Sequence, residues 1–140
     1  MEKFAFILHP LSLQDMEHLS PLMRYIPDPI IEACLKMKKP FKVSHITGIK
    51  SPYAEAEGWF IGCPLTAKQM VELPEEFVMD RIIESGKVAQ ELGAKIVGLG
   101  AFTSIVGDAG ITVAKNLDIA VTSGNSYTVA TAIQGTKQAA

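Results

Sequence analysis

The sequence KIVGLGAFTS, from Lys95 to Ser104, decides the fold of this 140-residue chain. Its first half is a short apolar run of the length of a buried strand, and its second half is a loop of small and polar residues. The sequence DIAVTSGNS, from Asp118 to Ser126, repeats this construction. A helical pattern follows each loop, from Asp108 to Asn116 and from Ser126 to Gln138. Short apolar strands that alternate with helices predict a parallel sheet, so both loops are expected at the same edge of it.

Upstream of these units lies the clearest helix of the sequence. Pro74 suits a first helical turn, and the carboxylates of Glu75 and Glu76 complement the positive end of the helix dipole. Gly93 is a typical helix stop. The apolar stripe that this helix presents at helical spacing consists of Val78, Ile82, Ser85, Ala89 and Leu92.

The first half of the chain predicts a strand, two helices and a hairpin. The strand runs from Phe4 to Leu8, and the helices run from Gln14 to Met23 and from Ile30 to Met37. Two runs rich in β-branched and aromatic residues, from Phe41 to Ile49 and from Ala54 to Ile61, are separated by the turn sequence KSPY. The predicted fold is therefore α/β, with an open, mostly parallel sheet, flanking helices and a β-hairpin, in a single domain over residues 1–140.

Composition restricts the possible partners. The formal net charge is -2 and the basic residues are scattered, so we expect no nucleic-acid partner. No apolar run approaches the ~20 residues that cross a bilayer, so no membrane span is expected. Cys34 and Cys63 are far apart in sequence, which favours a reducing, cytoplasmic setting. The apolar stripe of Val129, Ile133 and Thr136 is still running where the chain ends, so we expect the chain to be a fragment.

The two loops after the apolar strands are the candidate binding site, because open α/β sheets bind ligands beyond the carboxyl ends of their strands. Phe102, Thr103 and Ser104 offer an aromatic face and two hydroxyls, while the second loop offers a flexible backbone, an amide and a hydroxyl. The residues of that second loop are Gly124, Asn125 and Ser126. The alternative is structural: Asn125 or Ser126 caps a helix, and Thr103 and Ser104 fill a turn.

A dinucleotide site is not expected in this chain. Gly98 and Gly100 begin a GxGxxG fingerprint, but Thr103 stands where the third glycine should be. Asp118 has the spacing of the ribose-binding acid, but it precedes its strand instead of ending it. No GxxxxGK[ST] phosphate loop is present.

Metal binding is not expected either, because His9, His18 and His45 are not paired at ligand spacing. His45, in the middle of the hairpin, is a candidate acid or base. Cys63, where a strand gives way to a turn, is a candidate nucleophile, although buried cysteines usually fill a core. Glu55 and Glu57 share one strand face and could be paired carboxylates, or the exposed side of a hairpin.

Three strings carry a family resemblance: GWFIGC from Gly58, LGAFTSI from Leu99 and TSGNSYT from Thr122. In this order and spacing they resemble the N-terminal part of long-chain fatty acyl-(acyl carrier protein) reductases and their shikimate or quinate dehydrogenase-like relatives. The resemblance covers roughly Phe41 to Ala140.

The resemblance implies an N-terminal domain that helps to hold an acyl-thioester substrate, followed by a Rossmann domain that binds NAD(P). In such reductases a thiol of the later region accepts the acyl group, and hydride from NADPH releases an aldehyde. The nucleophile is therefore not carried over to Cys34 or Cys63. The site residues that the resemblance implies are Phe102, Thr103, Ser104, Gly124, Asn125 and Thr128. The small, polar sequence GDAG from Gly107 departs from what a long acyl chain needs, so a smaller substrate is expected.

Three hypotheses follow. The leading one is the substrate-side domain of an NAD(P)-dependent oxidoreductase, inactive without its downstream Rossmann domain. The alternative is a stand-alone small-ligand-binding or dimerisation module without catalysis. A third role, compatible with the first, uses the apolar stripe of the last helix as a docking face for a domain or for a homo-oligomer.

Overall fold

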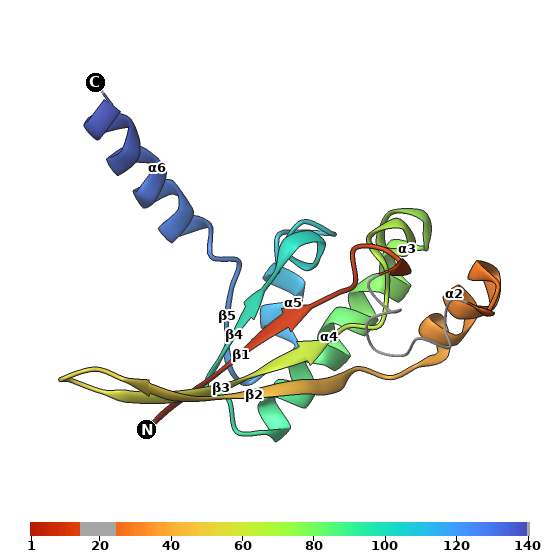
Figure 1. Ribbon diagram of the computed structural model, residues 1–140, viewed down its shortest axis with the longest axis horizontal. Coiled ribbons are helices and arrows are strands. Elements are labelled where there is room, and N and C mark those ends of the chain that lie inside the picture. Colours follow the sequence, from red (N-terminus) through yellow and green to blue (C-terminus); the bar gives the residue numbers. More distant parts are fainter. Residues whose placement is uncertain (15–24, 140) are drawn as a thin grey trace.

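A single twisted sheet organises the computed structural model, which describes residues 1–14 and 25–139 (Figure 1). The strand order is β2-β3-β1-β4-β5. β3, β1, β4 and β5 are parallel, and β2 pairs antiparallel with β3. The strands are β1 (Glu2–Leu8), β2 (Phe41–Lys50), β3 (Glu55–Gly62), β4 (Ile96–Leu99) and β5 (Ala120–Thr122). The helices are α2 (Asp28–Met37), α3 (Ala67–Glu72), α4 (Glu75–Glu91), η2 (Ala101–Ser104, a 3₁₀ turn), α5 (Ile111–Lys115) and α6 (Asn125–Ala139).

This architecture confirms the predicted α/β class, the mostly parallel sheet and the hairpin. The hairpin turn is held by Ser51, whose hydroxyl accepts hydrogen bonds from the N–H groups of Tyr53 and Ala54. Gly93 ends α4 with a φ of 85°, as expected of a glycine stop. The predicted helix from Gln14 to Met23 lies outside the described residues, except for Gln14 itself.

Two elements differ from expectation. The helix predicted from Asp108 begins only at Ile111, because Ala109 and Gly110 have left-handed φ angles of 57° and 91° that cannot lie inside a helix. The short helix α3 was not predicted. It begins with a capping box in which the Thr66 hydroxyl accepts from the Gln69 N–H and the Gln69 side chain accepts from the Thr66 N–H.

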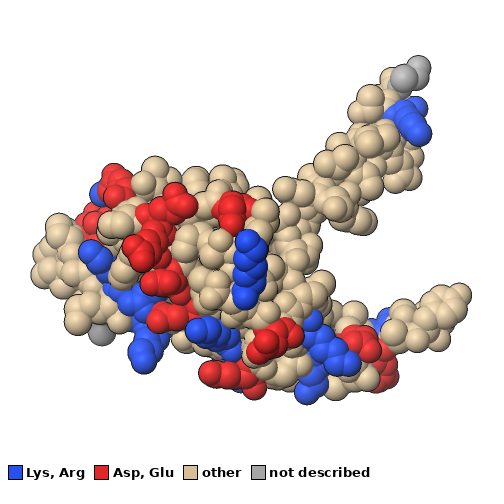
Figure 2. Space-filling model, turned by 180° about the vertical axis from the view of Figure 1, so that it is seen from behind, with Lys and Arg blue, Asp and Glu red and all other residues tan. Residues whose placement is uncertain are grey.

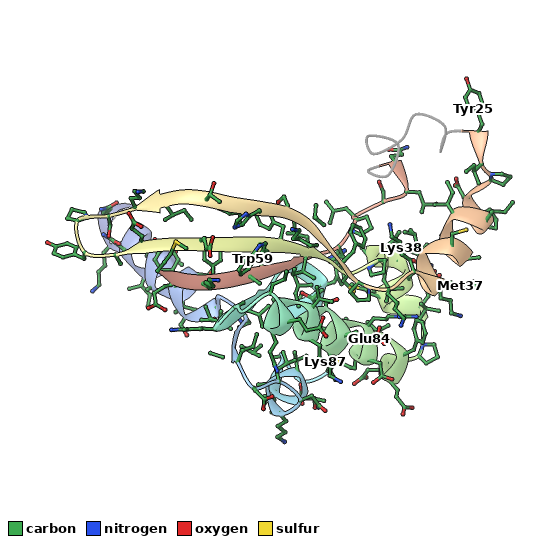
Figure 3. All side chains as sticks on the ribbon, turned by 90° about the horizontal axis from the view of Figure 1, so that it is seen from below. Tyr25, Met37, Lys38, Trp59, Glu84 and Lys87 are labelled. Carbon is green, nitrogen blue, oxygen red and sulfur yellow. The ribbon has the colours of Figure 1, made fainter. Side chains whose placement is uncertain are left out.

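Within the described residues, the main core cluster lies on one side of the sheet, and a small second cluster joins Ile31 and Leu35 of α2 with Leu13. Ala5 and Ile7 of β1, with Trp59 and Ile61 of β3, point toward helices α4 and α5, which lie together behind the sheet in Figure 1 and below it in Figure 3. On α4 the predicted stripe is confirmed. Its buried members are Val78, Ile82, Ser85 and Ala89, with Leu92 partly buried.

The opposite side, which we call the open face, consists mainly of apolar side chains that alternate with the core residues along the same strands, together with Ser44 opposite Phe60. Phenylalanine rings occupy the space above glycines here: an added Cβ would meet the ring of Phe4 at Gly58, and the ring of Phe6 at both Gly98 and Gly100. The apolar side chains of the open face are Phe4, Phe6 and Leu8 of β1, Phe41, Val43, Ile46 and Ile49 of β2, Phe60 of β3 and Ile96 of β4.

Helix α6 leaves the sheet after β5 and projects away from the rest of the molecule (Figure 1). None of its residues is buried. Tyr127, Val129 and Ile133 are exposed apolar side chains on it. Within the described residues, no helix is long and apolar enough to cross a membrane.

Candidate functional site

The carboxyl ends of the four parallel strands lie at one edge of the sheet, as the sequence predicted for the two loops. β4 runs into η2, and β5 runs into the turn at Ser123 and Gly124 that precedes α6. β1 adds His9 at this edge, and β3 adds Cys63, whose N–H donates to the Leu8 carbonyl at 2.8 Å. This carboxyl edge is therefore where ligands of open α/β sheets bind.

The η2 turn uses its own hydroxyls to hold its shape. Thr103 is buried and its Oγ1 donates to the Gly100 carbonyl at 2.8 Å, while Ser104 Oγ donates to the Ala101 carbonyl at 2.7 Å. Ala101 has a φ of 48°, a conformation that non-glycine residues rarely adopt and that is concentrated at functional sites. Of the three residues predicted here, Phe102 presents a half-buried ring, and the two hydroxyls shape the turn.

His9 links β1 to the η2 turn. Its Nε2 accepts a hydrogen bond from the Phe102 N–H at 3.3 Å, and its Nδ1 lies 3.1 Å from the Pro10 carbonyl oxygen. Because a carbonyl only accepts and an N–H only donates, the proton of the neutral ring is on Nδ1. The His9 and Phe102 rings also meet edge to face, with centroids 5.8 Å apart. His9 is the site residue that the sequence did not single out.

The loop between β5 and α6 is exposed. Gly124 has a φ of 74°, and its N–H donates to the Thr122 hydroxyl at 3.1 Å. The Thr128 N–H and hydroxyl both lie 3.2 Å from the Gly124 carbonyl oxygen, to which they donate. Asn125 and Ser126 begin α6 and are exposed, so their side chains face solvent.

A cavity of about 490 Å³ lies beyond the ends of β1 and β3, between the residues that follow β1 and the helices α2 and α3. Its lining is Leu11, Ser12, Leu13, Gln14, Ile26, Asp28, Ile31, Glu32, Thr66 and Lys68. Lys68 pairs with Glu32 at 3.3 Å. This volume is in the range of small-ligand pockets, and the lining combines apolar side chains with Lys68 and the carboxylates of Asp28 and Glu32.

A second hollow of about 570 Å³ separates α4 from the turn at Gly107. Four carboxylates line it: Glu75, Glu76, Asp80 and Asp108. Asp108 caps α5, and hydrogen bonds from the Thr112 N–H and hydroxyl hold the pKa of its carboxyl below the usual value. These carboxylates would repel a substrate that carries phosphate groups, so this hollow does not suit a coenzyme A or carrier-bound thioester.

Cys63 is not an activated nucleophile in this structure. Its side chain is fully buried, and burial raises the pKa of the thiol to about 11, while the nearby Ser85 hydroxyl offsets only part of this rise. The thiol therefore keeps its proton at neutral pH, and the thiolate is the reactive form.

We expect Cys34 to react with a thiol reagent such as iodoacetamide in the native protein, and Cys63 to react only when the protein unfolds. Cys34 is exposed and serves as the matched internal control. Mass spectrometry of alkylated peptides at pH 7, with and without denaturant, measures both sites. Because the raised pKa keeps the folded thiol protonated until about pH 11, mild alkaline conditions should not abolish the difference. Equal native labelling would show that Cys63 is accessible.

His45 lies away from the carboxyl edge, on the hairpin. Its ring stacks on Trp59 with centroids 5.4 Å apart and 9° between the planes, and its Nε2 lies 3.1 Å from a carboxylate oxygen of Glu57. Lys3 pairs with the same carboxylate at 3.3 Å. Partial burial raises the pKa of Glu57, but the contacts with Lys3 and His45 outweigh it and hold the pKa below the usual value. Glu55 pairs separately with Lys50. Glu55 and Glu57 therefore pair with separate basic partners instead of forming one dyad.

Within residues 1–14 and 25–139, no three His, Cys, Asp or Glu side chains are grouped where they could hold a metal ion.

Comparison with known proteins gives a partial match. No family model matches the chain. Aminotransferase PigE of Serratia sp. (strain ATCC 39006) is 38% identical to it over 87 residues. That stretch covers 62% of this chain but only 10% of the relative, so the chain spans about a tenth of the length of that protein.

Proposed function

We propose that this chain is the substrate-side α/β domain of a larger NAD(P)-dependent oxidoreductase that acts on a small acyl thioester. The observation that carries the proposal is the carboxyl edge. His9 and the η2 turn are in contact there, the β5–α6 loop follows a strand of the same sheet, and a cavity of about 490 Å³ lies beyond β1 and β3, in a sequence that has no dinucleotide fingerprint of its own.

The residues of the edge suit different parts of such a substrate. The Phe102 ring offers an apolar surface, and the exposed side chains of Asn125 and Ser126 offer an amide and a hydroxyl for polar groups. Thr103, Ser104, Gly124 and Thr128 hold the two loops in place through hydrogen bonds. The bound nicotinamide would supply hydride, and we assign its binding, and the nucleophilic thiol, to a Rossmann domain outside this chain.

The relative supports the idea of one domain in a larger enzyme, since the similar stretch is a tenth of its length. That protein is named as an aminotransferase. An aldehyde is a carbonyl acceptor for amino-group transfer, so a reductase step that releases an aldehyde is chemically compatible with such a relative.

We expect the 140-residue chain to be stabilised by a short-chain acyl-coenzyme A, with no consumption of NADPH. A ligand at 100 times its Kd adds about 2.7 kcal/mol to the free energy of unfolding, which a thermal shift detects. Asn125→Ala should weaken this shift. Gln134→Ala, farther along the same helix, is the matched control. The protein encoded by the complete gene should oxidise NADPH in the presence of the same thioester.

The outcomes are distinct. A thermal shift with no downstream Rossmann domain in the gene would favour the stand-alone binding module. No shift with short or long acyl thioesters, together with no NADPH oxidation by the complete protein, would contradict the proposal.

A further inference from the structure

Among the described residues, no helix covers the open face of the sheet. Phe6 is 37% exposed, Ile96 41% and Val43 49%, and they belong to different strands of one continuous surface. The rings of Phe6 and Phe60 touch edge to face with centroids 6.3 Å apart, so the surface is a packed apolar layer. Parallel sheets occur almost only with both faces covered, yet α4 and α5 cover one face here (Figure 3).

Helix α6 is likewise not packed against any other described part of the chain, since none of its residues is buried. Its only charged residue is Lys137, whereas a solvent-exposed helix usually carries charges over most of its surface. Figure 2 shows the contrast: acidic and basic side chains are interspersed over the body, while α6 projects from it almost without charge. Its threonines, Val129, Ile133 and Gly135 have low helix propensity. A fifteen-residue helix of this composition needs a packing partner to remain helical in water.

The helix and the open face are complementary. Val129, Ile133 and Thr136 form a narrow, uncharged stripe along α6. A fifteen-residue helix is about 22 Å long, and five strands about 4.8 Å apart span about 19 Å. The helix therefore fits across the sheet, and its small residues suit a surface already filled by phenylalanine rings.

We propose that α6 packs on the open face of a second copy of this chain, and that the exchange is reciprocal. In one copy both surfaces are exposed at once, because α6 projects away from its own sheet (Figure 1). In a two-fold dimer, the α6 helix of each copy covers the open face of the other, so both helices and both open faces are buried. Such an exchange of identical elements is a low-cost route to a dimer. This inference does not depend on the proposed function.

The size of the contact is consistent with a weak dimer. A helix about 22 Å long and about 10 Å wide covers a footprint of about 220 Å². Two reciprocal contacts remove four such footprints, about 880 Å², from solvent, which is the size of a weak, concentration-dependent interface. The turn at Ser123 and Gly124, in which the Gly124 φ is 74°, sets the direction of the exchanged helix.

Complementation between two single variants tests this arrangement. Light scattering coupled to size exclusion should show a dimer for the unaltered chain. Ile133→Glu places a charge on the stripe of α6, and Ile96→Lys places one on the open face. Each should raise the dimer dissociation constant at least about tenfold, or about 1.4 kcal/mol. Thr131→Glu, on the opposite side of α6, is the matched control and should leave the dimer intact. Circular dichroism checks that every variant is folded.

Mixing the two defective variants should restore a dimer. The mixture contains one unaltered helix that faces one unaltered sheet, and the second contact brings a glutamate to a lysine. Native mass spectrometry of the two species, which differ in mass, identifies the mixed dimer. The inference would be overturned by a monomeric unaltered chain or by a dimer that survives both substitutions. The absence of a mixed dimer would also overturn it, because a dimer formed only by contacts between two α6 helices would not be restored by mixing the variants.

Discussion

Ile7→Ala should lower the free energy of unfolding by about 3 kcal/mol, because it removes three carbons from the centre of the core. Ile7 is fully buried in β1, between Ile61 of β3 and Leu99 of β4 in the register of the sheet. The neighbouring strands are fixed by hydrogen bonds on both sides, so the site cannot collapse fully and a cavity remains. Equilibrium unfolding in urea, at a protein concentration matched between variants, measures the loss.

Leu8→Ala is the matched control for this prediction. Leu8 is the next residue of the same strand, but it points to the open face and is 37% exposed. Its truncation removes less buried surface and should cost about 1 kcal/mol. Equal losses at the two positions would mean that the sheet is not one-sided as described.

The sequence predicted those parts of the fold that depend on local pattern. The apolar run from Ile96 to Leu99 ends in small residues, and the stripe on α4 repeats with helical period, so both could be recognised without tertiary information. The capping box at Thr66 was visible too, but α3 has six residues, too few for a periodic pattern.

The candidate site was predictable in position but not in detail. The carboxyl edge follows from the order of strands and loops. The contact between His9 and Phe102, by contrast, joins residues 93 positions apart, and no local pattern encodes it. The burial of Thr103 and Cys63 likewise depends on which face each residue takes once the sheet has formed.

The packing of phenylalanine rings over glycines on the open face can be recognised only in part from the sequence. Glycines at positions 58, 98 and 100 are visible in the sequence, but the phenylalanine rings that cover them come from β1. The rings occupy the space where Cβ atoms at these glycines would stand, so the apolar layer of the open face is packed against the backbone of the sheet. The same feature supports the helix exchange inferred above.

Gly58→Ala should lower the free energy of unfolding by about 2 kcal/mol, through overpacking and not through lost contacts. A Cβ at this position would lie 2.7 Å from two ring carbons of Phe4 and 2.7 Å from the Phe4 carbonyl oxygen. The ring could rotate away, but the carbonyl belongs to the neighbouring strand, so relief requires β1 and β3 to separate where Phe4 pairs with Gly58. Chemical denaturation and the melting temperature both report the change.

Gly135→Ala makes the same chemical change where nothing lies within 4 Å of the added Cβ. Gly135 is in the interior of α6, where alanine is favoured over glycine by roughly 0.5–1 kcal/mol. The two substitutions should therefore have opposite signs. If Gly58→Ala were neutral, the strands would have room to separate and the close contact between the Phe4 ring and the sheet would not exist. The open face would then be softer than described, and the fit of α6 against it would lose its geometric basis.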